Sequence, residues 1–418
     1  MELSVSIASG STNLPDRPVA SVPPWLVLLL AAACGLIVAN VYYAQPLAGP
    51  ISAALGLSPL AAGLIVTMTQ IGYGAGLLLV VPLGDLFENR ALTLTALAVA
   101  ALALAAAAVA TDALAFLTAA LFIGVGSVAV QVLVPYAAHL APEAVRGRVV
   151  GNVMSGVMFG IMLARPAASF ITDELSWRAV FVISAAMMVA LGGVLRTALP
   201  RRRPTARLRY VTLLGSMGRL ARHTPVLRRR ALYHACLFGA FSLFWTTTPL
   251  LLSQTFLLSQ SGIALFALAG VAGAVSAPIA GRVADRGWSR PATGLAMLAV
   301  AAAFPLSHLG PPGSAPALAA LVAAAILLDF GVTANLVLGQ RAIYALGAAT
   351  RARLNGLYMA TFFAGGAIGS ALGGWAYARG GWMLASWIGL AMPMAALSYY
   401  LTEPPRRRSA GPITGESA

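Results

Sequence analysis

Long apolar stretches dominate this chain and decide what it can fold into. Each is long enough to cross the hydrocarbon core of a bilayer, which takes about 20 residues. Because no water is available at that depth, backbone donors and acceptors must pair within each segment, and runs rich in Ala, Leu, Val and Gly do so as helices. The sequence therefore predicts an all-α integral membrane protein with twelve transmembrane helices. They begin near Trp25, Leu60, Ala91, Ala113, Val149, Arg178, Ala231, Gly262, Pro291, Pro316, Leu354 and Trp382.

The low content of charged residues agrees with this prediction. Only 9% of the residues are charged and 59% are hydrophobic, whereas soluble domains carry roughly a quarter charged residues. The first apolar stretch follows a polar tail and is followed by further spans, so we expect it to be retained rather than cleaved as a signal peptide. Cys34 and Cys236 both fall in predicted helices, which argues against a disulfide framework and against a CxxC metal site.

The basic residues lie almost entirely on one side of the predicted spans. All 27 are arginines, of which 24 fall on one side, Arg178 and Arg379 fall on the other, and Arg165 lies within a span. This asymmetry follows the positive-inside rule and predicts a multi-pass protein of the inner (cytoplasmic) membrane with both termini in the cytoplasm. The net charge of +15 therefore indicates orientation in a lipid bilayer and no binding of nucleic acid.

The chain also repeats itself at a nearly constant offset. Asp85 and Arg90 recur 200 residues later, and the segment that begins at Arg146 recurs 205 residues later, as does Trp177. Such repeats predict two pseudo-symmetric six-helix bundles, residues 25–199 and 231–402. A basic cytoplasmic linker, residues 200–230, joins them, and cytoplasmic tails, residues 1–24 and 403–418, flank them.

The linker contains apolar residues at helical spacing among its arginines. Leu208, Val211, Leu214 and Met217 would lie on one face of a short helix. Such a helix could lie on the anionic inner leaflet. A disordered tether is the alternative.

These residues resemble the major facilitator superfamily, and within it the twelve-span drug:proton antiporter-like exporters. The segment GRVADRG resembles the family signature of the loop after the second span of each half, and GDLFENR is its weaker first copy. Spans five and eleven resemble the antiporter glycine signature, although close helix packing explains small residues without any chemistry. The residues that carry the resemblance are Gly84, Asp85, Arg90, Gly281, Asp285, Arg286, Gly287, Gly151, Gly160, Gly356, Gly365, Gly369, Ser370, Gly373 and Gly374.

The two loop copies predict a gate on the cytoplasmic side. We expect Asp85 and Asp285 each to accept hydrogen bonds from a nearby arginine and from a helix N-terminus of the facing span, holding that side shut. The alternative is a solvated loop charge. The predicted gate consists of Asp85, Arg90, Gly281, Asp285, Arg286 and Arg290.

Missing residues exclude several mechanisms. A phosphate-binding GxxxxGK[ST] loop needs a lysine, and the chain has none. Neither HExxH nor GxSxG occurs, so protease and esterase chemistry is unsupported. We therefore predict no enzyme activity, no cofactor and no metal. What remains is a carrier whose halves rock about a site near the bilayer midplane.

The resemblance implies that spans one, four, seven and ten, with parts of two, five, eight and eleven, border the substrate cavity. Aromatic faces and amides in those spans suit a moderately apolar substrate oriented by few hydrogen bonds. Ordinary packing is the alternative for each of them. The cavity candidates are Asn40, Tyr43, Gln70, Tyr73, Gln131, Trp245, Asn335, Tyr358 and Phe362.

Two charges fall inside predicted spans. Arg165 could extend outward as a structural anchor, or it could face the cavity and pair with an acidic group or substrate. Asp329 is the carboxylate nearest the midplane, where an ionised group must pair, bind a cation or take up a proton. We predict that Asp329 couples transport to protons. A packing role with Asn335 is the alternative, and pairing with Arg165 is the weaker option because the estimated depths differ by roughly 10 Å.

The leading prediction is a proton-coupled exporter, an antiporter that removes small amphipathic compounds by alternating access and works as a monomer. A facilitator or importer of a small neutral metabolite is the first alternative. A non-transporting membrane sensor is the second, although the short tails offer no extra domain. The predicted partners are a small-molecule substrate, protons and the lipid bilayer.

Overall fold

A computed structural model describes residues 23–143, 145–201, 209–347 and 350–403. The first half contains α1 (Pro24–Ala39), α2 (Ala48–Leu55), η1 (Pro59–Ala61), α3 (Leu64–Leu79), η2 (Val81–Asp85), α4 (Asn89–Val109), α5 (Ala113–Ser127), α6 (Ala129–Leu140), α7 (Arg146–Glu174) and α8 (Trp177–Ala198). The linker forms α9 (Tyr210–His223). The second half contains α10 (Pro225–Gln254), α11 (Gln260–Ala267), η3 (Leu268–Val271), α12 (Ala272–Asp285), α13 (Ser289–Leu306), α14 (Ala315–Tyr344) and α15 (Arg351–Leu401).

The helices account for all twelve expected spans. In the described part of the chain, nine helical stretches are long and apolar enough to cross a membrane, counting α3 with η2, α5 with α6, and α11 with α12 as one stretch each. The last of them, α15, is broken at Gly380 and Gly381, where Gly381 has a φ of 59° that favours glycine. It therefore contributes two spans. With the shorter α1 and α13, the all-α twelve-helix fold is confirmed.

Each half is held together by the same glycine contact. The first helix of each half crosses the fifth so closely that a side chain on Gly160 would lie 2.1 Å from the Gly35 carbonyl oxygen, and one on Gly369 would lie 2.0 Å from that of Gly239. Small residues permit such an approach between membrane helices. The packing interpretation of Gly160 and Gly369 is confirmed, whereas a side-chain carbon added at Gly151 would meet no atom of the described residues within 4 Å.

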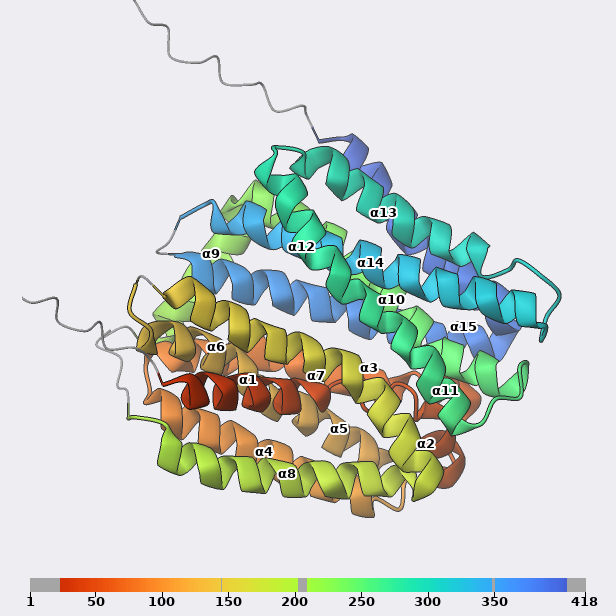
Figure 1. Cartoon of the computed structure of the whole chain (residues 1–418), viewed down its shortest axis with the longest axis horizontal. Coiled ribbons are helices and arrows are strands. Elements are labelled where there is room, and N and C mark those ends of the chain that lie inside the picture. The colour runs from red at the N-terminus through yellow and green to blue at the C-terminus, as the bar shows by residue number, and fades with distance from the viewer. Residues whose placement is uncertain (1–22, 144, 202–208, 348–349, 404–418) are drawn as a thin grey trace, which may run out of the picture.

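The two halves lie side by side, with α1–α8 in one and α10–α15 in the other, and α9 lies at one end of the molecule (Figure 1). We call that end the linker side and the other end the far side. Helices α3 and α15 pack together across the halves, as do α7 and α11. Toward the far side the Thr67 and Ser370 hydroxyls are 2.8 Å apart, and Ser261 donates to Asp173 at 2.6 Å. The halves are therefore joined at the far side.

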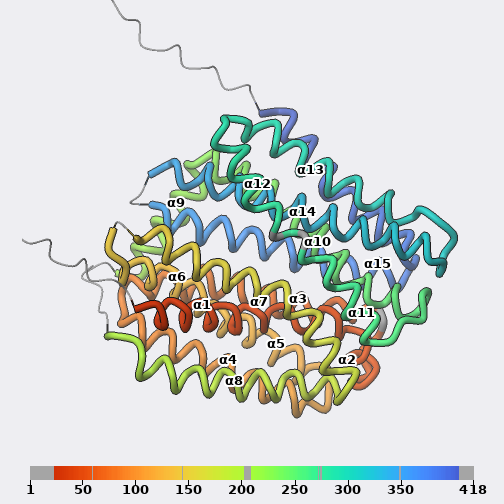
Figure 2. Tube along the Cα trace, in the orientation of Figure 1, coloured from red at the N-terminus to blue at the C-terminus, as the bar shows by residue number. Residues whose placement is uncertain are grey.

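The linker helix α9 contacts both halves. The Tyr210 hydroxyl donates to the Leu79 carbonyl at the end of α3, 2.7 Å away, and Arg353 at the start of α15 donates to the Ser216 hydroxyl at 3.0 Å. Figure 2 shows this short segment at the linker side of the chain trace. The linker thus forms a helix that bridges the halves.

The buried face of α9 differs from the one expected. Leu213 and Met217 are buried, but Val211 is 78% exposed, and Leu208 lies outside the described residues. The tails at residues 1–22 and 404–418 lie outside them as well. On the expected face Met217 is buried, Leu214 is half-buried and Val211 is open, while contacts with α3 and α15 hold α9 between the halves. That the open side lies on the membrane surface stays a prediction.

Candidate functional site

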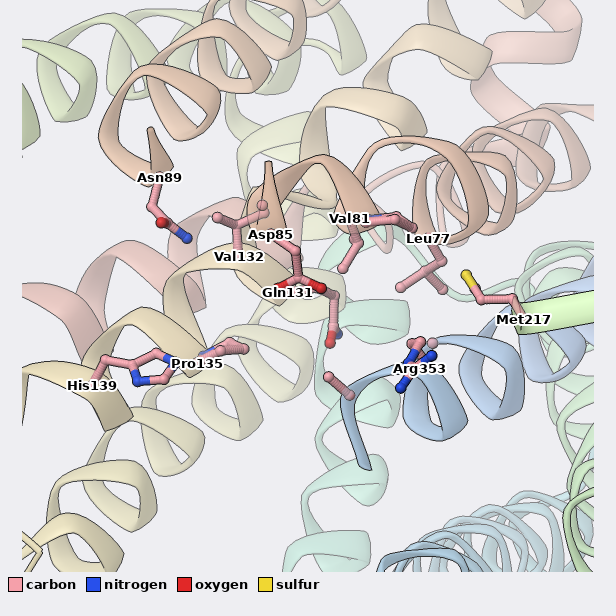
Figure 3. A pocket seen from close by; sticks show the side chains of 14 residues that line it. Leu77, Val81, Asp85, Asn89, Gln131, Val132, Pro135, His139, Met217 and Arg353 are labelled. Atoms are coloured by element: carbon pink, nitrogen blue, oxygen red, sulfur yellow. The ribbon is translucent and has the colours of Figure 1, made fainter. Parts of the chain in front are cut away.

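A cavity of about 150 Å³ opens at the linker side between the halves (Figure 3). A cavity of that size can hold a molecule such as benzene. Its walls come from α3, η2, α4 and α6 of one half, from the start of α15 in the other, and from Met217 of α9. The lining residues are Leu77, Val81, Pro82, Gly84, Asp85, Asn89, Gln131, Val132, Pro135, His139, Met217, Ala352, Arg353 and Gly356.

One of the predicted cavity residues, Gln131, lines this space, and a second, Tyr73, bonds to it. Gln131, which lines the cavity, donates through Nε2 to the Tyr73 hydroxyl at 3.2 Å. The Tyr73 ring in turn lies 4.4 Å from the Phe363 ring of the other half, measured between centroids. Gln131 and Tyr73 thus connect the linker-side cavity to the interface between α3 and α15.

A row of rings follows one face of α10 from the linker side toward the middle of the helix. His234, Phe238, Phe241 and Trp245 are spaced at four, three and four residues, which puts them on one helical face. Phe362 of α15 stacks on this row, with its centroid 3.6 Å from Phe238 and 4.6 Å from His234. We call these four α10 residues the aromatic row. Only Trp245 among them was predicted as a site residue, although the helical spacing would have indicated the others.

The aromatic row ends at two buried charges. The Trp245 indole N–H donates to Asp329 Oδ1 at 2.8 Å, and the Arg165 guanidinium lies 4.3 Å from the Trp245 ring centroid. Arg165 Nε also donates to Gln45 Oε1 at 2.7 Å. Asp329 is 4% exposed and Arg165 is 2% exposed. We call Gln45, Arg165, Trp245 and Asp329 the charge centre; it draws on both halves.

Arg165 and Asp329 are much closer together than their positions in the sequence predicted. A first side-chain carbon at Gly270, in the short η3 segment, would lie 2.8 Å from Asp329 Oδ2 and 3.2 Å from Arg165 Nη1. The sequence estimate concerned the depths of the two backbone positions, roughly 10 Å apart, and left pairing as the weaker option. The long arginine side chain bridges the remaining difference in height, although the ion pairs formed within 4.0 Å in the described part of the chain do not include these two groups.

Other cavity candidates lie in different surroundings. Gln70 donates to the Ser242 hydroxyl of the other half at 2.7 Å, so it joins α3 to α10. Asn40 instead accepts from Ser184 at 2.5 Å, inside the first half. Tyr43 is buried in the same half.

The remaining two candidates lie within the second half. Asn335 pairs with His234 at 2.9 Å, and the Tyr358 ring stacks on His234 with centroids 5.4 Å apart. The structure therefore brings Gln70, Tyr73 and Trp245 into contact with the opposite half, while Asn335, Tyr358 and Phe362 pack in the second bundle.

The residues of the predicted gate form contacts within each half. Arg341, which was not among the predicted gate residues, donates to the Gly281 carbonyl at 2.6 Å and to the Asp285 carboxylate. Arg90 donates to the Leu199 carbonyl at 3.1 Å, and Arg290 donates to the Glu403 carbonyl at 2.5 Å. These two arginines thus occupy equivalent positions at the end of the last helix of each half. Asp85 and Arg286 are exposed.

The gate prediction for Asp285 remains a shift of the Asp285→Asn variant toward the form that is open at the linker side, as in the structure described here. The pair with Arg341 is exposed and lies within the second half, so the gate role requires that Asp285 also meets the first half when the linker side closes, and we expect an equilibrium shift of only about two- to fivefold. Labelling of single cysteines in the linker-side cavity, in a background without Cys34 and Cys236, measures the shift. Asp112→Asn, at the far side, is the matched control. Labelling that is unchanged in the Asp285 variant would exclude a gate role for Asp285.

Comparison with known proteins agrees with the fold. The family model described as Major Facilitator Superfamily matches residues 27–323. The uncharacterized transporter YgaY of Escherichia coli O157:H7 is 38% identical over 367 residues, covering 88% of this chain and 92% of that protein. The chloramphenicol efflux pump MT0201 of Mycobacterium tuberculosis (strain CDC 1551 / Oshkosh) is 27% identical over 283 residues, covering 66% and 67%.

A solved structure of a bacterial homologue of the human lysosomal transporter Spinster, inward-facing and unoccupied, superimposes with a TM-score of 0.70. Its sequence identity is 16%, and the match covers 90% of this chain and 95% of that one. At that identity the likeness concerns the fold alone. Twelve spans in two repeated halves, a site between them and a family match over most of the chain lead to one conclusion: the chain belongs to the major facilitator superfamily and is a multi-pass secondary transporter, not an enzyme.

Proposed function

We propose that this transporter exports small amphipathic compounds in exchange for protons. The observation that carries the proposal is the charge centre, in which Asp329 is buried between the halves and bonded to Trp245 beside Arg165. An ionised carboxylate at such a depth is costly unless another charge compensates it, so intramembrane acids commonly mark ion pathways. A group that is compensated in one arrangement of the halves and exposed in another can take up a proton on one side and release it on the other.

The contacts between the halves support alternating access. The far side is held by Thr67 with Ser370 and by Asp173 with Ser261, while the cavity lies at the linker side. Rocking of one half against the other would open the first set of contacts and close the cavity. Since one chain supplies both halves and the charge centre lies between them, the transport unit is a monomer in this proposal.

The arginines support an orientation with the linker side in the cytoplasm. Among the described residues, α9 and the loops at its end of the molecule carry most arginines. By contrast, Arg178 donates to Ala110 at the opposite end of α4 from the cavity, and Arg379 comes just before the break that ends the first span of α15. The positive-inside rule places the first group in the cytoplasm. The cavity would then accept compounds from inside the cell, and the likeness to a chloramphenicol efflux pump supports export as the direction.

Transport into inside-out vesicles tests both the direction and the coupling. Purified protein is reconstituted in liposomes, oriented vesicles are selected, and radiolabelled chloramphenicol is offered with and without an imposed pH gradient. A wider panel of amphipathic compounds follows. We expect gradient-dependent accumulation that a protonophore abolishes and that protein-free liposomes lack. Equal rates with and without the gradient across the panel would instead indicate a facilitator and overturn proton coupling.

A further inference from the structure

Two hydrogen-bond donors of the charge centre lack partners among the described residues. Gln45 Nε2 and Arg165 Nη2 are both buried and neither bonds to another described residue, although Gln45 Oε1 and Arg165 Nε bond to each other. The hydroxyl of Ser169, one helical turn beyond Arg165 on α7, is also buried with no partner in that part of the chain. A buried donor left unpaired costs about 1 to 3 kcal/mol, and at the charge centre two such donors lie on side chains that bond to each other.

Aromatic rings surround the guanidinium that carries one of these donors. The Arg165 carbon Cζ lies 4.3 Å from the Trp245 ring centroid, 5.0 Å from that of Phe241 and 5.4 Å from that of Tyr42. Such rings offer flat apolar faces next to two free N–H groups. A ligand that is flat and apolar, with an oxygen at one end, would match both features.

The charge of the surroundings favours a neutral ligand over an anion. Arg165 and Asp329 both lie next to Gly270, so their charges largely offset each other when Asp329 is ionised. An added carboxylate would leave one uncompensated negative charge in a site of low dielectric. A carbonyl or nitro oxygen can accept the same hydrogen bonds without that cost. Glycine is required at position 270, because even a first side-chain carbon would lie 2.8 Å from Asp329 Oδ2, so a ligand can enter only when the halves move apart.

We propose that Gln45 and Arg165 form the subsite that binds a neutral hydrogen-bond acceptor, a carbonyl or nitro oxygen, carried on a flat aromatic ring. This assignment names the substrate class of the transporter proposed above and rests on that proposal. Phe241 and Trp245 contact the ring, and the two free N–H groups hold the oxygen. The aromatic row leads to this subsite from the linker side.

Trp245 connects substrate binding at this subsite to the protonation of Asp329. Its indole N–H donates to Asp329, and its ring faces Arg165. Protonation of Asp329 turns a charge-assisted hydrogen bond into a neutral one of about half the strength. Trp245 is then less firmly held, and the ring that positions Arg165 can move. Substrate and proton would thus exclude each other, as exchange requires.

Few other groups near Asp329 are charged or titratable and could make substrate binding depend on pH. Arg165 on α7 and Tyr42 after α1 are the charged and titratable groups that face it. The neighbours from α12 and η3 are Gly273 and Gly270, and the α13 residues that meet α14 near Gly331 are Ala296 and Val300. Those four carry no titratable side chain.

Binding of three matched small probes tests the subsite without any gradient. The probes 4-nitrobenzyl alcohol, 4-(hydroxymethyl)benzoate and 4-aminobenzyl alcohol share one ring and differ in the group opposite the alcohol. Ligand-observed NMR on the full chain in nanodiscs compares their affinities. We expect the nitro compound to bind best at alkaline pH. Tightest binding of the carboxylate or of the amine would overturn the neutral-acceptor assignment.

Substitutions at the two proposed donors test whether the nitro probe binds at this subsite. Arg165→Lys loses the planar fork and Gln45→Met loses its free donor, so each should weaken nitro-probe binding by about tenfold. Arg178→Lys is the matched control, because Arg178 also lies over a tryptophan, 4.2 Å from the Trp177 centroid, but outside the charge centre. Wild-type affinity in both site variants would refute the subsite. If one variant fails to fold, the other decides.

Trp245→Phe tests the link to the proton. Wild-type protein should bind the nitro probe more weakly in acidic buffer, whereas Trp245→Phe, which keeps a ring but loses the indole N–H, should show the same affinity in both buffers. A pH dependence that persists unchanged in this variant would rule out Trp245 as the link. Because these measurements need no transport, a protein that binds as expected but does not exchange protons would disprove the proposed function alone.

Discussion

Replacing Asp329 by Asn should abolish gradient-driven export and reduce it to the level of protein-free vesicles. The amide can still accept the Trp245 hydrogen bond that the carboxylate accepts at 2.8 Å, but it cannot take up or release a proton. Counterflow exchange, which needs no net proton movement, should survive, although substrate binding should weaken toward the level of wild-type protein in acidic buffer, because the amide is uncharged like the protonated acid. The measurement is uptake into inside-out vesicles with an imposed pH gradient, run beside counterflow with equal substrate on both sides.

Comparing uphill transport with substrate binding in the Asp329 variant identifies the role of this carboxylate. Normal uphill transport by the Asp329 variant would exclude it as the proton carrier. Loss of binding alone would instead reassign it to recognition of a cationic substrate. Glu174→Gln, which changes an exposed carboxylate at the end of α7, is the matched control. It should leave proton coupling intact, because Glu174 lies outside the charge centre.

Valine at Gly160 should prevent the first half from packing. A side-chain carbon there would lie 2.1 Å from the Gly35 carbonyl oxygen, and because that oxygen belongs to the backbone of another helix, no side-chain rotation relieves the clash. Overpacking costs about 1 to 3 kcal/mol where side chains can adjust, so we expect a larger loss here. Size-exclusion chromatography and thermal unfolding in detergent measure it.

Gly151 provides the control for this substitution on the same helix. A side-chain carbon at Gly151 would meet no atom of the described chain within 4 Å, so Gly151→Val should give a well-folded protein with nearly unchanged thermal stability. The repeat predicts the same loss for Gly369→Val in the second half, where the Gly239 carbonyl oxygen lies at 2.0 Å. Equal stability of the Gly160 and Gly151 variants would mean that this crossing is not required.

The spans could be predicted from the sequence because the hydropathy signal is strong over their whole length. The expected starts at Ala113 and near Arg178 agree with α5 and α8, which begin at Ala113 and Trp177. The largest difference is α10, which begins at Pro225 rather than near Ala231. Proline is favoured in the first helical turn, and arginines near a membrane surface can extend their charge into water, so a helix can start before its apolar part.

The contents of the site were harder to predict. Arg165 and Asp329 stood out because charges inside spans are rare, but their proximity depends on helix tilt and side-chain reach, which residue counting ignores. Asn40 shows a second limit. The order of spans indicates which helices border the centre, but it does not indicate which face of α1 turns there, and Asn40 bonds to Ser184 inside its own half. Whether these residues act in transport remains a prediction.

The cavity beneath α9 offers a place for drugs to act. Its walls come from both halves, and Met217 of α9 adds a side chain to them. A compound bound in this cavity would stop transport, because the two halves could not close the linker side while it is there. Since cargo is proposed to enter through the same cavity, such a compound would compete with cargo for entry, although it need not resemble cargo at the charge centre, which lies elsewhere along the interface.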